Sequence, residues 1–472
     1  MNIYIPIEVK ARELEGKFLT ALVAAERGHH VLIGDKKDTI NLAKEGKLPP
    51  GIVHDKSVTP GSYKIENFKK LKQNGHLITA QDEEHGLLDV SYEEFAKRRF
   101  SEETLSYVSR VYTWGSHDYH ELQKKFTGQK KKFMNSGSPR VDLWRPDFKE
   151  FYTLKNPEYK PYILISSNFS TLLDENRLYD RIARLRDAGY FDRDPGMEEY
   201  MYENSAYQLR LVHRFIEMIR ELAGTFPDLN FLVRPHPVES VDAWEKLIGN
   251  SDYTNVIVER KGTINGWLHH SELLIHNGCT TALEAVAGNI PAIAYRPIPS
   301  SYEREIPNQL SIQASKISEI RELIVSIRKG KNPTNKGFRS DDDPMKLLNN
   351  RLCSLQGDLA SEKIVNDWEK LANENNLPVS DLTEFKNTGK NIGVPVKRKL
   401  KRKLVMVRNK LFGIEAERKS KEYRLLTGHK FPHLHDDEIE EMINNFRKVT
   451  GRFDNVNTKR FGEKTFLLFS EN

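Results

Sequence analysis

An arginine and a histidine directly follow an apolar run in this sequence. The run 231–233 ends in Arg234 and His236, and a proline comes after each of them. Arginine binds phosphate oxygens through two parallel hydrogen bonds, and histidine donates to a phosphate or protonates a leaving oxygen. Proline restricts the backbone, so less entropy is lost when both side chains hold a ligand. The stretch predicts an anion site at a strand end, and a stiff turn is the simpler alternative.

A second motif lies about 40 residues further on, where the apolar run 273–275 ends in His276-Asn277-Gly278. A helix is predicted over 280–288, and Thr281 has the spacing to Glu284 of a capping box. A helix that starts at a parallel strand's end points its free N–H groups at bound anions. The predicted phosphate ligands are therefore Arg234, His236, Asn277, Gly278, Thr280 and Thr281. Taken alone, the second motif also fits a capped turn in any α/β protein.

Acidic residues follow another predicted strand, 76–80, and supply candidates for acid–base chemistry. Asp82, Glu83 and Glu84 are adjacent, so mutual repulsion raises at least one pKa toward the range of a general base. We predict that Glu83 or Glu84 acts in catalysis together with His236, and a solvated acidic loop is the alternative for any single acid.

Charged residues also follow the first predicted strand, 2–7, where a plain connection needs none. Glu8, Lys10 and Arg12 are predicted to bind an acceptor, and Asn168, after the strand 162–169, is predicted to face the same cleft.

No metal or other cofactor is predicted. The triplets at 192–194 and 341–343 have the Asp-x-Asp pattern, but neither follows an apolar strand, and the two cysteines form no zinc motif. A helix dipole and nearby cations are expected to neutralise a leaving phosphate instead.

The elements that must position these residues alternate between strand and helix in two series. Alternation of this kind predicts parallel, doubly wound sheets. We predict an α/β fold with two Rossmann-like domains facing a cleft. The predicted boundaries are 1–145 for the first domain, 146–161 for a linker, 162–375 for the second domain and 376–472 for a basic helical tail.

The tail contains a strongly basic segment at 396–412, with eight lysines and arginines and no acid. Its apolar residues recur every three or four positions, which predicts one apolar stripe on a helix. Such a helix fits the surface of an anionic membrane, and an ordinary packed helix fits equally well. Nucleic-acid binding is not expected, because no aromatic residues interleave the charges.

Composition predicts a soluble protein of the cytoplasm. The 472 residues are 38% hydrophobic and 30% charged, with a formal net charge of +6. We find neither a signal peptide nor an apolar run of the roughly 20 residues that span a bilayer. Two cysteines suit a reducing compartment. A peripheral contact with the inner face of the cytoplasmic membrane is the expectation attached to 396–412.

Several segments resemble known families. "RPHPVES" and "IHNGCTTALEAVAGNIPAIAY" are similar to the donor-binding domain of GT-B-fold glycosyltransferases. "IPIEVKARELEGKFLTALVAAERGHHVLIG", "DEEHGLL" and "NSGSPRVDLWRP" resemble the bacterial surface carbohydrate biosynthesis protein family. Histidine–proline elements also occur in Kdo transferases, sialyltransferases and poly(glycerol-phosphate) transferases. By this resemblance, His236 and Arg234 would hold a donor phosphate, with Thr280 and Thr281 alongside.

The resemblance implies an enzyme, a glycosyltransferase that moves a sugar from a nucleotide donor to lipopolysaccharide, capsule or a related surface glycan. A CMP-Kdo-like donor is the first expectation, with a glycan or lipid-linked glycan as acceptor. The alternatives are a CDP-alditol polyol-phosphate transferase, a UDP-sugar 2-epimerase and a non-catalytic nucleotide-sugar-binding assembly protein. The sugar, the acceptor, the stereochemical course and the oligomeric state do not follow from the sequence.

Overall fold

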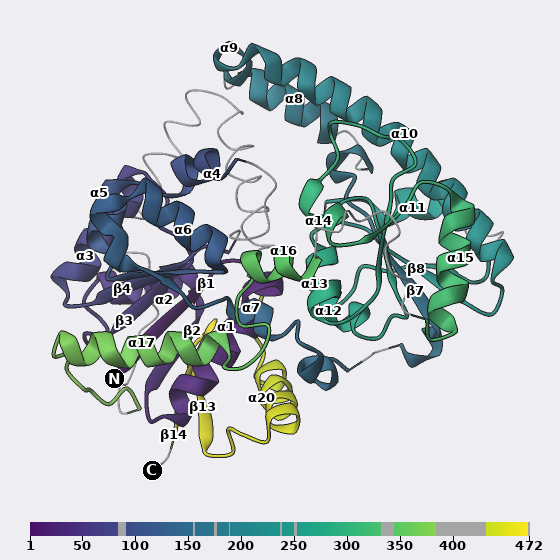
Figure 1. Ribbon diagram of the computed structural model, residues 1–472. Coiled ribbons are helices and arrows are strands. Elements are labelled where there is room, and N and C mark those ends of the chain that lie inside the picture. Colours follow the sequence, from purple (N-terminus) through teal and green to yellow (C-terminus); the bar gives the residue numbers. More distant parts are fainter. Residues whose placement is uncertain are drawn as a thin grey trace, which may run out of the picture. The chain divides into compact units, whose positions relative to one another are not determined.

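The computed structural model of this chain describes residues 1–83, 91–153, 156–173, 177–187, 189–236, 238–249, 253–331, 344–383 and 431–470. The chain divides into two compact units. Unit 1 comprises residues 1–86, 90–143 and 352–472, and unit 2 comprises residues 87–89 and 144–351. Both are built on a mainly parallel sheet with helices, which confirms the predicted pair of Rossmann-like α/β domains (Figure 1).

The sheet of unit 1 has the strand order β13-β14-β2-β1-β3-β4-β5-β6. From β2 to β6 every neighbouring pair is parallel. The strands of this parallel part are β1 (Asn2–Ile7), β2 (His30–Asp35), β3 (Ile52–Asp55), β4 (Leu77–Gln81), β5 (Arg110–Thr113) and β6 (Phe133–Asn135). The order reverses between β1 and β3, and open α/β sheets bind ligands beyond the carboxyl ends of the strands at such a switch point.

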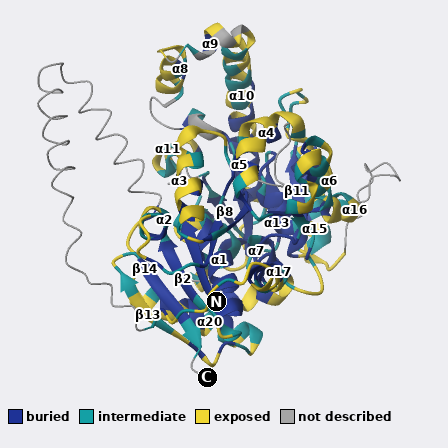
Figure 2. Ribbon diagram, turned by 90° about the vertical axis from the view of Figure 1, so that its left-hand side faces the viewer, coloured by how far each residue is buried: buried dark blue, intermediate teal, exposed yellow. Residues whose placement is uncertain are grey.

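Helices connect these strands, and their apolar faces are buried against the sheet (Figure 2). They are α1 (Lys10–Glu26), α2 (Lys36–Lys44), α3 (Ser62–Gln73), α4 (Tyr92–Arg99), α5 (Glu102–Tyr107), α6 (Ser116–Lys125), the 3-10 helix η1 (Thr127–Lys132) and α7 (Pro139–Asp142). Helix α1 begins at Lys10, in the segment after strand 2–7 that was predicted as a connection, so Glu13 and Lys17 lie on one helix, one turn apart.

The sheet of unit 2 is parallel throughout, in the order β12-β11-β10-β7-β8-β9. Its strands are β7 (Tyr162–Ser166), β8 (Asn230–Arg234), β9 (Val256–Val258), β10 (Leu274–His276), β11 (Ala292–Tyr295) and β12 (Ile312–Ala314). Numbered from β7, the order reads 3-2-1-4-5-6, which is that of dinucleotide-binding domains. The switch point lies between β7 and β10, the two strands that precede the predicted Asn168 and Asn277.

The helices of unit 2 are α8 (Arg177–Asp187), α9 (Tyr190–Arg193), α10 (Pro195–Thr225), α11 (Val241–Ile248), α12 (Ile264–Leu268), α13 (Thr281–Ala287), α14 (Glu305–Gln309), α15 (Ile317–Arg328) and α16 (Pro344–Arg351), with the 3-10 helices η2 (Pro146–Phe151), η3 (Pro157–Tyr159) and η4 (Ser170–Leu173). Residues 146–161 were predicted as a linker. They belong to unit 2 instead, because Phe148, Phe151 and Tyr152 are buried, and Tyr152 stacks on His269.

Helix α17 (Ala360–Glu374) was predicted to close the second domain, and it belongs to unit 1. Asp142 accepts hydrogen bonds from the first N–H groups of α17, at 2.8 and 3.0 Å. Asp367 accepts from Arg110 and from the Tyr112 hydroxyl, at 2.8 to 2.9 Å. Hydrogen bonds to β5 and α7 therefore attach α17 to unit 1, although its sequence position is close to that of unit 2.

The end of the chain adds a helix and two strands to unit 1, where a basic helical tail was predicted. They are α20 (Asp436–Thr450), β13 (Val456–Gly462) and β14 (Thr465–Ser470), and β14 pairs antiparallel with β2. The pairing requires glycine at Gly34, since an added Cβ would lie 2.1 Å from the Lys464 carbonyl oxygen. The predicted basic helix at 396–412 lies outside the described residues. Among those that are described, no helix combines the length and hydropathy of a membrane span.

Candidate functional site

The predicted phosphate ligands lie at the carboxyl edge of the unit 2 sheet. Strand β7 is paired with β8 on one side and β10 on the other, and Ser166 is in register with both Arg234 and His276. The loops after these three strands therefore start side by side, at the switch point of the sheet.

Glu239 joins two of these loops and is the organising residue of the site. It is only 1% exposed. Its carboxylate accepts hydrogen bonds from the Ser167 hydroxyl at 2.5 Å, the Phe169 N–H at 2.7 Å, Trp244 Nε1 at 2.9 Å and the His236 N–H at 3.3 Å. Burial raises the pKa of Glu239, and the four donors oppose that rise. One buried acid thus fixes the loop after β7 against the loop after β8.

His236 presents a hydrogen-bond donor at this edge. Its Nδ1 accepts from the Val238 N–H at 3.4 Å, so the proton of the neutral ring lies on Nε2. Burial lowers the pKa of His236 below its usual value. Nε2 has no hydrogen-bond partner within the described part of the chain. The residue is therefore a neutral donor that is positioned through its own backbone, and it is not a standing cation.

Arg234 is engaged with the protein. Its guanidinium donates to the carbonyl oxygens of Lys261 at 3.1 Å and Gly262 at 2.6 Å, in the loop after β9. Burial lowers the pKa of Arg234 to about 10, so the side chain keeps its charge at neutral pH. Two of its five N–H groups bond this loop. The predicted pair of parallel hydrogen bonds from Arg234 to a phosphate therefore has no direct support.

Asn168 and Asn277 connect the loops after β7 and β10. The Asn168 N–H donates to Asn277 Oδ1 at 2.9 Å, which turns the amide nitrogen of Asn277 the other way. That nitrogen is buried and has no hydrogen-bond partner among the described residues. A buried, unpaired donor costs about 1–3 kcal/mol, so this one is a natural place for a ligand oxygen.

His276 is structural, although its sequence position matches that of a ligand. The ring is fully buried, and burial lowers the pKa of His276 to about 3. Its Nδ1 accepts from the Gly278 N–H at 3.0 Å, and Nε2 bonds the Ser311 hydroxyl at 2.8 Å. Gly278 has a φ of +82°, and an added Cβ would lie 2.9 Å from the Cβ of Arg304. The glycine thus permits contact with Arg304, where contact with a ligand was predicted.

Thr281 was predicted to cap helix α13, and it lies inside that helix. Its hydroxyl contacts Ser166 Oγ at 3.3 Å and Cys279 Sγ at 3.1 Å. Thr280 holds the N-cap position, but its side chain makes no capping hydrogen bond. The hydroxyl of Thr281 is therefore engaged between β7 and β10, while the Thr280 side chain makes no hydrogen bond to the described residues.

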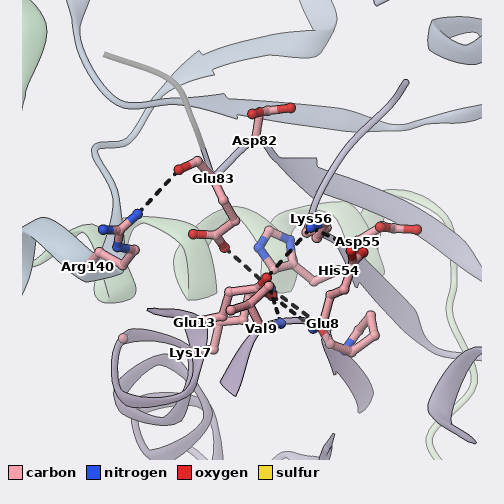
Figure 3. A network of polar contacts seen from close by, with 12 residues as sticks. Glu8, Val9, Glu13, Lys17, His54, Asp55, Lys56, Asp82, Glu83 and Arg140 are labelled. Carbon is pink, nitrogen blue, oxygen red and sulfur yellow. Dashed lines mark hydrogen bonds and ion pairs between the residues drawn. The ribbon is translucent and has the colours of Figure 1, made fainter. Parts of the chain in front are cut away.

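A second polar cluster lies in unit 1, beyond the carboxyl ends of β1, β3 and β4 (Figure 3). The Glu13 carboxylate accepts from the N–H groups of Glu8 and Val9, both at 3.1 Å. Lys17 donates to Glu13 at 2.8 Å and to the Pro6 carbonyl at 3.2 Å. Burial disfavours the charged form of both side chains, but the attraction between them is stronger. The pKa of Glu13 is therefore lowered and the pKa of Lys17 is raised.

The predicted acid–base residue Glu83 belongs to this cluster. Its carboxyl lies 3.4 Å from Lys17 Nζ, and the residue is 5% exposed. Burial raises the pKa of Glu83, Glu13 adds to the rise, and Lys17, Arg140 and Arg12 oppose it. A buried carboxyl whose pKa is raised in this way is a candidate for acid–base chemistry. Glu84, the other predicted acid, lies outside the described residues.

Further ion pairs surround these residues. Glu8 pairs with Lys36 at 3.2 Å and Lys56 at 3.1 Å, and Asp55 pairs with Lys64 at 2.7 Å. Burial opposes the charge of Glu8, but the two lysines lower its pKa to about 2. Glu8 and Asp55 thus each have a partner of opposite charge within the protein.

Of the other predicted acceptor residues, Lys10 bonds Glu438 at 2.5 Å and the His433 carbonyl at 2.9 Å, so it ties α1 to the C-terminal segment. Arg12 is half-buried and near enough to Glu83 to favour its ionised form. Sequence reasoning missed Glu239 and Lys17. The signals were a glutamate three residues after His236 and the i, i+4 spacing of Glu13 and Lys17, which lie on α1.

Comparison with known proteins gave no match to any family model and none to a curated protein. The resemblance to the surface carbohydrate family and to Kdo transferases therefore stays a prediction. Similar solved structures include the S. aureus MnaA–UDP co-structure (TM-score 0.45, 12% identity, 80% of this chain and 99% of that chain). Another is UDP-GlcNAc 2-epimerase from Neisseria meningitidis bound to UDP-GlcNAc (0.45, 11%, 78% and 100%). A third is the wall teichoic acid polymerase TagF (0.40, 10%, 69% and 72%).

Proposed function

We propose that this chain is an enzyme of nucleotide-sugar chemistry, in which the carboxyl edge of the unit 2 sheet binds the phosphate groups. One observation carries the proposal. Ser167, Asn168 and Phe169, after β7, are bonded to Glu239 on one side and Asn277 on the other. This rigid frame at the switch point holds two donors, His236 Nε2 and Asn277 Nδ2, that have no partner among the described residues.

Neutral donors in a preformed frame suit a phosphate well. An anion that binds here does not first have to break an existing ion pair, and little side-chain entropy is lost on binding. Charge-assisted hydrogen bonds to phosphate oxygens are roughly twice as strong as neutral ones. The dinucleotide-type strand order supports the same ligand class, since such sheets bind nucleotides at this edge.

The chemical step is assigned to Glu83 in unit 1. A carboxyl whose pKa is raised by burial serves as a general base for sugar transfer and as a proton acceptor at a sugar carbon. Transfer also requires an acceptor site. Glu8 and Lys10, predicted for that role, are paired with Lys36, Lys56 and Glu438, so nothing in their surroundings favours it.

We therefore place 2-epimerisation of a UDP-sugar first, since this reaction needs a nucleotide-sugar and an acid–base group but no acceptor. The CMP-Kdo-like donor has no support in the geometry of the described residues. A polyol-phosphate transferase remains the second enzyme candidate, because it would use the same phosphate-binding edge. A binding protein without activity would keep nucleotide affinity after loss of Glu83.

A nucleotide screen tests the proposal. Thermal shift is measured with UDP, CDP, CMP and GDP on the full chain, because a ligand that binds only the folded state raises Tm. We expect UDP to raise Tm most and His236→Ala to weaken its binding about tenfold, the effect of losing one charge-assisted hydrogen bond. The matched control is His213→Ala, on α10 of the same unit and 68% exposed, which should bind like the parent.

The reaction is tested separately, by proton NMR of UDP-N-acetylglucosamine in D2O. Epimerisation predicts deuterium at C2 and a second set of sugar signals, both lost in Glu83→Gln. Deuterium uptake that persists in Glu83→Gln would reject the role of Glu83. If no nucleotide shifts Tm at millimolar concentration, the phosphate site itself is rejected.

A further inference from the structure

The carboxyl of Glu83 is buried, but it makes no hydrogen bond within the described part of the chain. Its one close polar contact is the ion pair with Lys17 at 3.4 Å. Buried polar atoms in proteins almost always have a hydrogen-bond partner, and an ordered water is a common one when protein atoms supply none. The Glu83 carboxylate therefore requires a hydrogen-bond donor that the described residues do not supply.

A small cavity lies next to this carboxyl. It has about 10 Å³ of space for the centre of a water molecule, which is about the least that holds one water. Most of its walls are polar, and the side chains that matter are those of Glu13, Lys17, His54, Gln81, Glu83 and Arg140. Figure 3 shows Glu83, Lys17 and His54 together at this point.

His54 supplies a donor into the cavity, and its tautomer follows from its neighbours. Trp368 Nε1 can only donate, so Thr79 Oγ1 accepts from it at 3.1 Å. His54 Nδ1, 3.0 Å away, is the one acceptor for the Thr79 hydroxyl among the described residues, so the hydroxyl proton goes to it. The neutral ring carries its own proton on Nε2. That N–H has no partner among the described residues, although the histidine is only 3% exposed.

We propose that one buried water occupies this cavity and accepts from His54 Nε2–H while it donates to the Glu83 carboxylate. Lys17, with one N–H beyond those given to Glu13 and Pro6, is the second donor to that water. When Glu83 is protonated, its O–H replaces the Lys17 N–H as the second donor to the same water, so the carboxyl gains and loses a proton without moving. His54 is thus a positioning residue for Glu83.

The charged and titratable groups that face Glu83 come from three elements. They are Arg12, Glu13 and Lys17 of α1, His54 of β3 and Arg140 of α7. Among them only His54 is uncharged, since burial lowers its pKa to about 3. The water site does not depend on the proposed function; only the catalytic use of Glu83 rests on it.

Two conservative variants separate the donor from the fold. His54→Gln places an amide N–H near the position of Nε2 and gives up the bond to Thr79. His54→Asn keeps a group near Nδ1 for Thr79 and removes the donor from the cavity. The readout is the pKa of Glu83 in the substrate-free full chain, from the infrared band of the protonated carboxyl in difference spectra against Glu83→Gln.

We expect His54→Asn to raise the pKa of Glu83 by about one, or about tenfold in proton affinity, because the anion loses a hydrogen bond. His54→Gln should stay close to the parent. Equal shifts in both variants, or none in either, would overturn the proposal. A crystal structure gives the second arm: a water within about 3.2 Å of both His54 Nε2 and Glu83 supports the site, and an empty cavity rejects it. Neither arm uses a nucleotide, so failure here differs from failure of the proposed function.

Discussion

The carboxyl edges of the two sheets carry different kinds of side chain. At the edge of unit 1, carboxylates and lysines alternate, and Glu8, Glu13 and Asp55 each have a lysine partner. At the edge of unit 2, hydroxyls, amides and a neutral imidazole are arranged by the buried acid Glu239, and the cation Arg234 is bonded to the loop after β9.

The difference corresponds to two tasks. A cluster whose charges are matched inside the protein has little to offer a charged ligand, but it controls the proton affinity of a carboxyl such as Glu83. An edge made of neutral, fixed donors does little proton chemistry, but it binds an anion without first breaking an ion pair. The comparison assigns acid–base chemistry to unit 1 and anion binding to unit 2.

The largest expected effect comes from removing Lys17. Lys17→Met leaves Glu13 and Glu83 buried without their shared cation, and breaking a buried pair costs about 3–5 kcal/mol. We expect the free energy of unfolding of unit 1 to fall by that amount in urea titrations. The control is Lys70→Met, which breaks an exposed pair with Glu66 and should change little. A loss below about 1 kcal/mol for Lys17→Met would contradict the charge matching described for this edge.

Glu239→Gln tests the other edge and should cost less. The amide nitrogen would face N–H donors, and each donor left unpaired costs about 1–3 kcal/mol. We expect about 2–3 kcal/mol of lost stability in unit 2, together with weaker nucleotide binding, because His236 and Ser167 lose their common support. Glu217→Gln, at an exposed ion pair on α10, is the matched control. Unchanged nucleotide affinity in Glu239→Gln would show that the loops keep their positions without this acid.

Much of the fold was predictable, because the buried strands are short apolar runs bounded by turn residues. Strands β1 and β7 fall inside the predicted segments at 2–7 and 162–169. The position of α17 was not predictable. Its amphipathic sequence fits either unit, and the choice depends on hydrogen bonds such as that from Tyr112 to Asp367, 255 residues apart. The β13–β14 hairpin was missed because β13 lies at the sheet edge and is largely polar.

The candidate site was predictable where a side chain capable of binding or catalysis stands next to a proline or a glycine. His236 stands between two prolines, and Asn277 precedes a glycine, so both are visible in the sequence. Glu239 and Lys17 were not visible, since an isolated glutamate or lysine is usually a surface residue. Only the fold reveals that each is buried among its partners. His276, which was not among the predicted ligands although it stands beside them, holds a turn through its ring.

The smallest predicted effect concerns two buried neutral histidines, His54 in unit 1 and His276 in unit 2. Burial lowers the pKa of His54 and of His276 to about 3, well below the value of about 6.5 in an unfolded chain. Below pH 6.5 the unfolded state therefore binds more protons, and stability falls as the pH falls. Between pH 7 and pH 5 each histidine is expected to remove about 2 kcal/mol.

His276→Asn isolates this contribution for unit 2. Asparagine keeps an acceptor for the Gly278 N–H but does not titrate, so the variant should lose about 2 kcal/mol less than the parent between pH 7 and pH 5. Comparing the two pH dependences cancels the acids, among them Glu239, whose raised pKa acts in the opposite direction. Urea unfolding at both pH values supplies the measurement. If the two dependences are equal, His276 is already protonated or exposed in the folded protein, and the neutral character of the unit 2 edge is lost with it.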